Sequence, residues 1–193
     1  MLDKLKPTAT GPDELPSWFL RLSAPVIAEP LAQLINLSIK ASQVPTQWKS
    51  SNIKPIPKIT NPTSPSDYRP ISITSVLSRL TERLIISQFI YPALLSPPQE
   101  LTFSNQFAFR PTGSTTAALI NLFHTIAAIL DNDPYVRVIA LDFSKAFDTV
   151  RHAQLMSKIN QLKIPGNVCD WVADFLTGRH HRTIFEKEYS SPK

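Results

Sequence analysis

The sequence predicts an α/β fold, and three observations support this prediction. Apolar residues recur at helical spacing in several segments, a β-branched apolar run occupies 136–141, and prolines alternate with other residues in 53–58. The chain has 193 residues, of which 42% are hydrophobic and 18% charged. A chain of this size and composition can bury a core, so intrinsic disorder is not expected.

The N-terminal part is predicted to contain a tail or linker, 1–12, followed by two helices. A short helix is expected within 13–22. The second helix, over 25–41, has a proline in its first turn and apolar residues at helical spacing, and Pro45 ends it.

Two extended segments and a long helix are expected next. Prolines at every second position exclude a helix in 48–58 and allow an edge strand, because proline cannot donate a hydrogen bond to a neighbouring strand. A loop rich in proline, serine and threonine, 61–67, separates this segment from a short strand at 71–74. The following helix covers 75–95 and has one apolar face.

The second half of the chain alternates helices with one buried strand. Ser114 or Thr115 is expected to cap a helix that reaches Leu130. The run 136–141 is apolar on both faces apart from one arginine, which is typical of a central strand. Helices are predicted over 146–162 and 168–176, and 182–189 is predicted to start a strand pair.

Composition excludes several classes of protein. One cysteine rules out an intramolecular disulfide framework, and the four histidines show no metal-ligand spacing. No segment is apolar for long enough to span a bilayer, and the N-terminus lacks the apolar core of a secretory signal. We therefore expect an intracellular protein, with nucleus and cytoplasm undecided. Only four glycines occur, in no phosphate-binding loop pattern, and the net charge of +5 allows an anionic partner such as nucleic acid.

Asp142 is the residue most clearly suited to a chemical role. A carboxylate at the end of a buried strand lies in the crevice at the sheet edge, where Mg²⁺ commonly binds one or two carboxylates and substrate phosphates. A tight turn into a helix is expected to follow, and the free N–H groups at a helix start suit a phosphate. A lone aspartate at this place is otherwise a helix cap or turn former, so Asp142 alone leaves both interpretations open.

Several blocks of sequence occur in an order typical of one family. They are Trp48-Lys49 with Ile56-Pro57-Lys58, Asp67-Tyr-Arg-Pro-Ile-Ser72, Asn105-Gln-Phe-Ala-Phe-Arg-Pro111 through Ser114-Thr115, Asp142-Phe-Ser-Lys-Ala-Phe-Asp148, and Phe175-Leu-Thr-Gly-Arg179. Together, over about 13–185, they resemble the reverse transcriptases (RNA-directed DNA polymerases) of non-LTR, LINE-like and jockey-like retrotransposons. The resemblance implies the fingers and part of the palm of a right-hand polymerase.

The resemblance also implies a metal-dependent reaction. Asp142 would be the catalytic aspartate, and in a complete domain it would ligate two Mg²⁺ ions with help from the backbone carbonyl of Phe143. Two bridging metal ions neutralise charge at the attacking and leaving oxygens of a phosphoryl transfer.

A dNTP would lie against five residues of the resembling blocks. Backbone N–H groups of Lys145 and Ala146 would hold its triphosphate, and Phe147 would pack under the sugar and exclude a 2′-hydroxyl. Arg69 and Lys58 would reach over the phosphates from the fingers, and arginine suits this role because its planar fork binds phosphate bidentately. Lys58 could equally be a solvated edge-strand lysine, and Phe147 could also be a core residue.

Nucleic acid is the other partner that the resemblance implies. Gln106 and Arg110 would lie near the backbone of an RNA template or a DNA primer. Ala108 departs from the family pattern, which usually has glycine at this place; if the position needs a positive φ, alanine is strained there.

The family's later Pro-Gln-Gly and Ala-Asp-Asp blocks do not occur in this sequence. One aspartate and one carbonyl cannot hold two Mg²⁺ ions against hydration, so the chain is expected to be inactive alone. We expect a fragment with a fingers-like region at 13–135 and a partial palm at 136–193, lacking the C-terminal palm and thumb. Oligomeric state, template preference and any upstream endonuclease are not decided by the sequence.

Two alternatives remain open. The chain could be a non-catalytic remnant that binds nucleic acid through basic residues of the fingers, namely Lys54, Lys58, Arg69, Arg79 and Arg110. It could also be a helical interaction domain with fortuitous motifs, which a structure separating Asp142 from Arg69 and Phe147 would favour.

Overall fold

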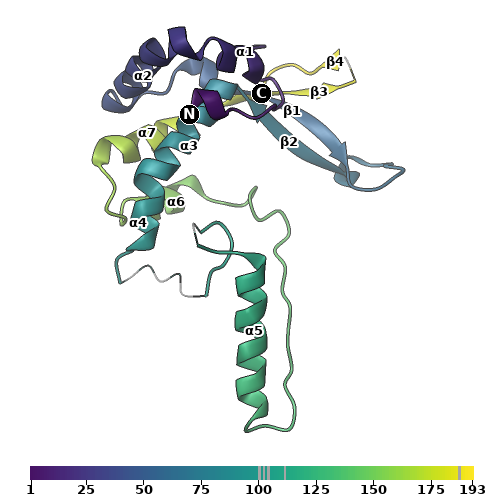
Figure 1. Ribbon diagram of the computed structural model, residues 1–193. Helices are drawn as coiled ribbons and strands as arrows, with labels where there is room; N and C mark the ends of the chain where they lie inside the picture. The colour runs from purple at the N-terminus through teal and green to yellow at the C-terminus, as the bar shows by residue number, and fades with distance from the viewer. Residues whose placement is uncertain (100, 102, 104, 111, 187) are drawn as a thin grey trace. The chain divides into compact units, whose positions relative to one another are not determined.

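The computed structural model describes residues 1–99, 101, 103, 105–110, 112–186 and 188–193. The chain forms two compact units, drawn in Figure 1. Unit 1 comprises 1–87 and 165–193, and unit 2 comprises 88–164. The C-terminal segment 165–193 belongs to the same unit as the N-terminal segment, and its strand β3 pairs with β1.

A four-stranded sheet in the order β2-β1-β3-β4 belongs to unit 1 (Figure 1). Its strands are β1 Ser50–Pro57, β2 Tyr68–Thr74, β3 His180–Phe185 and β4 Glu188–Tyr189. β1 pairs antiparallel with β2 and parallel with β3, and β3 pairs antiparallel with β4. The two predicted extended segments and the predicted C-terminal strand pair are therefore confirmed.

The prolines of β1 lie where this strand has a single neighbour. β3 pairs with β1 only over Ser50–Ile53, so Pro55 and Pro57 border β2 alone. Pro55 is opposite Pro70 of β2, and two residues without N–H groups fit a position at which no ladder hydrogen bonds form. The predicted edge strand is thus an edge only in its C-terminal half.

The described part of unit 1 contains four α-helices: α1 Ser17–Leu22, α2 Ala24–Lys40, α3 Val76–Ile85 and α7 Gly166–Leu176. Their buried side chains include Leu20, Ile35, Leu80 and Trp171, each at most 5% exposed. The helices predicted within 25–41 and 168–176 are confirmed to within two residues, whereas the one expected within 13–22 begins only at Ser17.

The first twelve residues, expected to be a tail, contribute to the core of unit 1. A 3₁₀ turn at Leu2–Lys4 contacts α1 and α2, and Leu2 and Leu5 are buried. Gly11 lies so close to Ser75 that a β-carbon at this glycine would be 2.5 Å from the Ser75 Cα. Only a residue without a side chain fits this approach.

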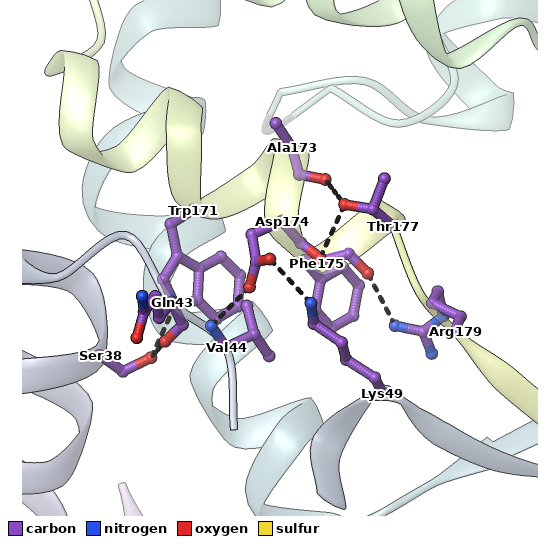
Figure 2. Close-up of polar contacts among 10 residues, drawn as sticks. All are labelled: Ser38, Gln43, Val44, Lys49, Trp171, Ala173, Asp174, Phe175, Thr177 and Arg179. Atoms are coloured by element: carbon purple, nitrogen blue, oxygen red, sulfur yellow. Dashed lines mark hydrogen bonds and ion pairs between the residues drawn. The ribbon is translucent and has the colours of Figure 1, made fainter. Parts of the chain in front are cut away.

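Side chains of α7 hold this helix against α2 and against the segment between α2 and β1, as Figure 2 shows. One oxygen of Asp174 accepts the backbone N–H of Val44 at 2.7 Å, and the other lies 2.8 Å from Lys49 Nζ. Trp171 donates its indole N–H to Ser38 Oγ at 2.9 Å. These contacts tie α7 to the start of β1, because Lys49 immediately precedes that strand.

Charged groups that are partly buried lie near the C-terminal end of α7. The guanidinium of Arg179 lies 4.4 Å from the centroid of the Phe175 ring and donates to the Phe175 carbonyl at 3.2 Å. Burial lowers the pKa of Arg179, and the charge of Glu82 acts against this shift. Burial raises the pKa of Glu82, although the hydroxyl of Ser78 donates to its carboxylate at 3.0 Å.

Unit 2 contains helices α4 Tyr91–Leu95, α5 Thr115–Leu130 and α6 His152–Ile159. A π-helical turn at Ile86–Ile90 precedes α4, so the helix predicted over 75–95 is continuous but not uniform. Pro92 accounts for the wider turn, because it offers no N–H to the carbonyl of Gln88 and its ring crowds that carbonyl. The Ser114 hydroxyl accepts the N–H of Ala117 at 3.1 Å, which confirms the predicted cap of α5.

The segment 136–141 is not a strand, so this prediction is wrong. Residues 135–143 have no regular secondary structure, and Ile139 and Leu141 are 75% and 87% exposed. A strand forms by pairing with a neighbour, and no described residue pairs with this run. A sequence that is apolar on both faces also needs a covering layer on each side, which this segment does not have.

The helices that the structure describes include none that is both long and apolar enough to cross a membrane.

Candidate functional site

The hairpin formed by β1 and β2 carries Lys58 and Arg69. Arg69 is opposite Ile56 in the ladder, and its side chain is exposed. Lys58 follows the last residue of β1, and its backbone N–H donates to the Asp67 carbonyl at 2.7 Å. The Lys58 ammonium donates to the Ser66 carbonyl at 2.7 Å, so one of its three N–H groups is engaged within the hairpin.

The connection between β1 and β2 is held in shape by Asp67. One carboxylate oxygen of Asp67 accepts the backbone N–H groups of Thr63 and Ser64, each at 2.9 Å. These two hydrogen bonds, with smaller contributions from the Ser64 side chain and the charge of Lys58, lower the pKa of Asp67. The loop therefore has a defined conformation next to Arg69.

Asp142 lies in unit 2, in the irregular segment that was expected to be a strand. Its carboxylate is exposed rather than placed at the end of a buried strand. Phe143, whose carbonyl was expected to assist, is exposed as well. Within the described residues, no three His, Cys, Asp or Glu side chains are grouped so that they could hold a metal ion.

The segment after Asp142 is a series of turns and not the start of a helix. Lys145 has φ of 53°, in the left-handed region, and its carbonyl accepts the N–H of Asp148 at 2.9 Å and that of Thr149 at 3.2 Å. The helix predicted over 146–162 begins only at His152, so that prediction is wrong for its first six residues. The expected turn at Lys145 and Ala146 is present, but no helix begins directly after it.

Phe147 is 81% exposed and therefore is not a core residue in unit 2. Its ring meets the ring of Phe109 edge to face, with centroids 6.1 Å apart. Phe109 has a φ of 58°, so the left-handed position in its block is at Phe109 and not at Ala108. The strain considered for Ala108 is thus absent.

Gln106 and Arg110 make hydrogen bonds within their own loop. Gln106 donates its side-chain amide N–H to the Ala108 carbonyl at 3.1 Å, and Arg110 donates to the Phe103 carbonyl at 2.5 Å. Gly113 closes the same loop, because a β-carbon there would lie 1.9 Å from the Phe107 carbonyl oxygen. The loop thus places the Phe109 ring against Phe147.

The structure divides the nine predicted site residues between its two units. Lys58 and Arg69 belong to unit 1. The other seven belong to unit 2, where the Phe109–Phe147 contact brings the block at 105–110 together with the block at 142–148. Sequence reasoning missed this contact, although each block has a phenylalanine after an alanine, Phe109 after Ala108 and Phe147 after Ala146.

Sequence reasoning also missed the role of the block at 175–179 and of Asp174 before it. This block ends α7 and supplies the Phe175–Arg179 contact, while Asp174 binds Lys49 (Figure 2). A carboxylate on a mainly apolar helix was a signal for such an anchor, but its partner 125 residues away could not be found from spacing.

Comparisons with known proteins agree with the blocks. A family model described as reverse transcriptase (RNA-dependent DNA polymerase) matches residues 56–192. The chain is 32% identical over 164 residues to the probable RNA-directed DNA polymerase from transposon BS of Drosophila melanogaster, covering 84% of this chain and 18% of that protein. It is 30% identical over 159 residues to the probable RNA-directed DNA polymerase from transposon X-element of the same species, covering 82% and 17%.

A third relative is the retrovirus-related Pol polyprotein from the type-1 retrotransposable element R2 of Popillia japonica. It is 26% identical over 172 residues, covering 89% of this chain and 22% of that protein. The chain therefore spans about a fifth of the length of these relatives.

Proposed function

Because the chain belongs to the reverse transcriptase (RNA-dependent DNA polymerase) family of LINE-like elements, we propose that it takes part in RNA-templated DNA synthesis by a retrotransposon. The match over 56–192 carries this proposal, since it contains most of the β1–β2 hairpin and the whole Asp142 segment. The partners would be an RNA template, a DNA primer and dNTPs. The hairpin would lie in a fingers-like region, 13–135, and Asp142 in a partial palm, 136–193.

The nucleotide would be held from two places in the sequence. Arg69 is exposed on the hairpin, which leaves its guanidinium open to a triphosphate. Lys58 has two further N–H donors beside the one bound to Ser66 and would add a second cation. The exposed ring of Phe147, supported by Phe109, would offer a surface to the sugar. The backbone at Lys145 and Ala146 would meet the phosphates, with Gln106 and Arg110 nearer template or primer.

The described residues do not by themselves fit a two-metal site. Asp142 contributes one carboxylate, and no group of three ligands surrounds it. We assign to Asp142 and the Phe143 carbonyl one part of a Mg²⁺ site that needs further carboxylates. Magnesium supplies charge neutralisation at phosphate oxygens when it is bound. We expect no polymerase activity from the 193-residue chain alone.

Primer extension tests this proposal. In a reverse transcriptase that combines this chain with the family's later motifs, Asp142→Ala should reduce dNTP incorporation roughly 10³-fold or more. Asp170→Ala, on the exposed side of α7, is the matched control and should leave extension unchanged. Extension that survives Asp142→Ala would refute the assignment, and extension by the 193-residue chain alone would refute its expected inactivity.

A second candidate function is non-catalytic binding of nucleic acid, and one observation favours it. Lys54 and Arg69 are both exposed on one face of the sheet, and Arg182 of β3 shares this face through its hydrogen bond to Asn52 at 3.0 Å. Two other candidate cations are engaged elsewhere. Arg79 donates to the Ala9 carbonyl at 2.6 Å, and Arg110 to Phe103.

Salt dependence separates this function from unspecific adsorption. Binding of a single-stranded oligonucleotide should weaken steeply between low and high salt, and Lys54→Gln with Arg69→Gln should lower the salt slope by about 1 to 2. A chain that binds no better than a neutral protein of its size at low salt does not have this function.

A further inference from the structure

The four-stranded sheet has a cavity of about 500 Å³ on one face, entirely within unit 1. Its floor is formed by Ile53 and Pro55 of β1, Pro70 of β2 and Thr183 of β3. The loop 62–65 forms one rim, and the rings of Tyr68 and Phe185 line it as well. A volume of this size lies within the range of pockets that hold small molecules.

The lining of this cavity is uncharged and includes two aromatic rings. The rings of Tyr68 and Phe185 meet edge to face, with centroids 6.2 Å apart. None of the described lining residues carries a charge, and the polar groups among them are hydroxyls such as those of Thr63 and Thr183. Such a surface favours a flat, uncharged ring, which can offer its own edge or face to this pair of aromatic rings.

The cavity is preformed. Pro55 and Pro70 are directly opposite each other in the floor, and their fixed φ angles make that part of the hairpin stiff. Asp67 holds the rim by accepting the N–H groups of Thr63 and Ser64. A ligand would therefore bind without ordering a loop, which removes one of the usual costs of association.

We propose that this cavity is a binding site for a small, uncharged aromatic molecule. It is separate from the surface proposed to bind nucleotide, because neighbouring residues of a strand point to opposite faces. Arg69 lies between Tyr68 and Pro70 in β2, and Lys54 lies between Ile53 and Pro55 in β1. The cavity and these cations are thus on opposite faces of the sheet, and the proposal does not depend on polymerase function.

Methyl NMR of the full 193-residue chain tests the site with three probes of similar size. The probe 2-naphthol is aromatic and uncharged, decahydro-2-naphthol is its saturated counterpart, and 2-naphthoate is its anionic one. We expect 2-naphthol to bind with a dissociation constant on the order of 1 mM, as for other fragment-sized ligands. It should shift the methyl resonances of Ile53 and Thr183, whereas the methyls of Ile71, on the other face, should stay in place.

Variants then distinguish binding at this site from nonspecific binding elsewhere on the surface. Phe185→Ala should weaken binding of 2-naphthol about tenfold, since it removes one aromatic wall. Ile71→Ala and Arg69→Gln, both on the opposite face, should leave binding unchanged whether or not the chain binds nucleotides. If Phe185→Ala does not fold, Phe185→Leu keeps an apolar side chain without the ring and should also weaken binding.

Three results would overturn the proposal. One is the absence of shifts at Ile53 and Thr183 at concentrations several times the expected dissociation constant. Another is equal binding of the saturated probe, and the third is tighter binding of 2-naphthoate. Tighter binding of 2-naphthoate would mean that the probes bind through the cations of the opposite face.

Discussion

The carboxylate of Asp174 lies 2.8 Å from the ammonium of Lys49, and this ion pair joins α7 to the residue that precedes β1. The second oxygen of Asp174 accepts the N–H of Val44. One side chain thus anchors α7 to the start of β1, the strand that pairs with β2 and its Arg69.

Asp174→Asn should destabilise unit 1 by on the order of 1 kcal/mol at neutral pH, because the pair is partly exposed and solvent screens it. Burial acts to raise the pKa of Asp174, but the hydrogen bonds from Lys49 and Val44 together outweigh it and lower the pKa below 3.8. The stabilisation is therefore present above 3.8 and is lost as pH falls through the lowered value. Urea unfolding at neutral pH and near pH 3 measures this. Asp170→Asn on the same helix is the control, and an equal loss in both variants would contradict the anchor.

Trp171→Ala should destabilise the chain far more than Trp18→Ala. Trp171 is 2% exposed and donates to Ser38, so its removal should cost about 3–5 kcal/mol. Trp18 is 61% exposed, so its removal should cost only about 0.5 kcal/mol. Thermal or urea unfolding followed by circular dichroism gives both values. Similar losses would mean that Trp18 also packs against other residues.

Gly113→Ala should disrupt the loop that carries Gln106 and Arg110. The added β-carbon would collide with the Phe107 carbonyl, so local stability should fall by about 1–3 kcal/mol. Hydrogen exchange of the Gln106 backbone N–H, which donates to the Phe103 carbonyl, reports this loss. Gly166→Ala is the matched control, since nothing lies within 4 Å of its added β-carbon. Unchanged exchange in Gly113→Ala would show that the loop can shift at little cost.

Glu82→Gln should stabilise the chain at neutral pH by on the order of 1 kcal/mol. Burial raises the pKa of Glu82 above 4.5, which means that the folded state holds the proton more tightly than the unfolded chain. Stability is therefore lost as pH rises from 4.5 through the raised value, and a neutral glutamine should remove this slope. Unfolding at several pH values compares Glu82→Gln with Glu29→Gln, an exposed control on α2. A less stable Glu82→Gln would mean that attraction to Arg179 outweighs the burial.

Several local elements could be predicted from the sequence because they depend on neighbours in the chain. Spacing of apolar residues predicted α2 in unit 1, and a hydroxyl before an apolar run predicted the cap of α5 in unit 2 at Ser114. Alternating prolines indicated an extended β1 but could not show that β3 pairs with its first half, since that neighbour lies far away in sequence.

The sequence blocks of the candidate site could be predicted, but the spatial arrangement of their residues could not. The run 136–141 has the composition of a central strand, yet composition does not supply partners, and Asp142 consequently lies exposed beyond an irregular segment. Spacing alone did not indicate the turns at 144–149, after which the helix begins only at His152. The Phe109–Phe147 contact depends on a loop conformation that spacing alone does not determine.

The register of β1 against β3 also sets the order of events during synthesis on the ribosome. Asn52 pairs with Arg182, 130 residues later, so the whole of unit 2 is translated between the two. At ordinary elongation rates this takes roughly 6–26 s, during which the open edge of β1 at Ser50–Ile53 has no partner from β3. An unpaired edge can recruit strands from other chains. Slow or stalled translation across 88–164 would lengthen this exposure and with it the time during which the nascent chain can aggregate.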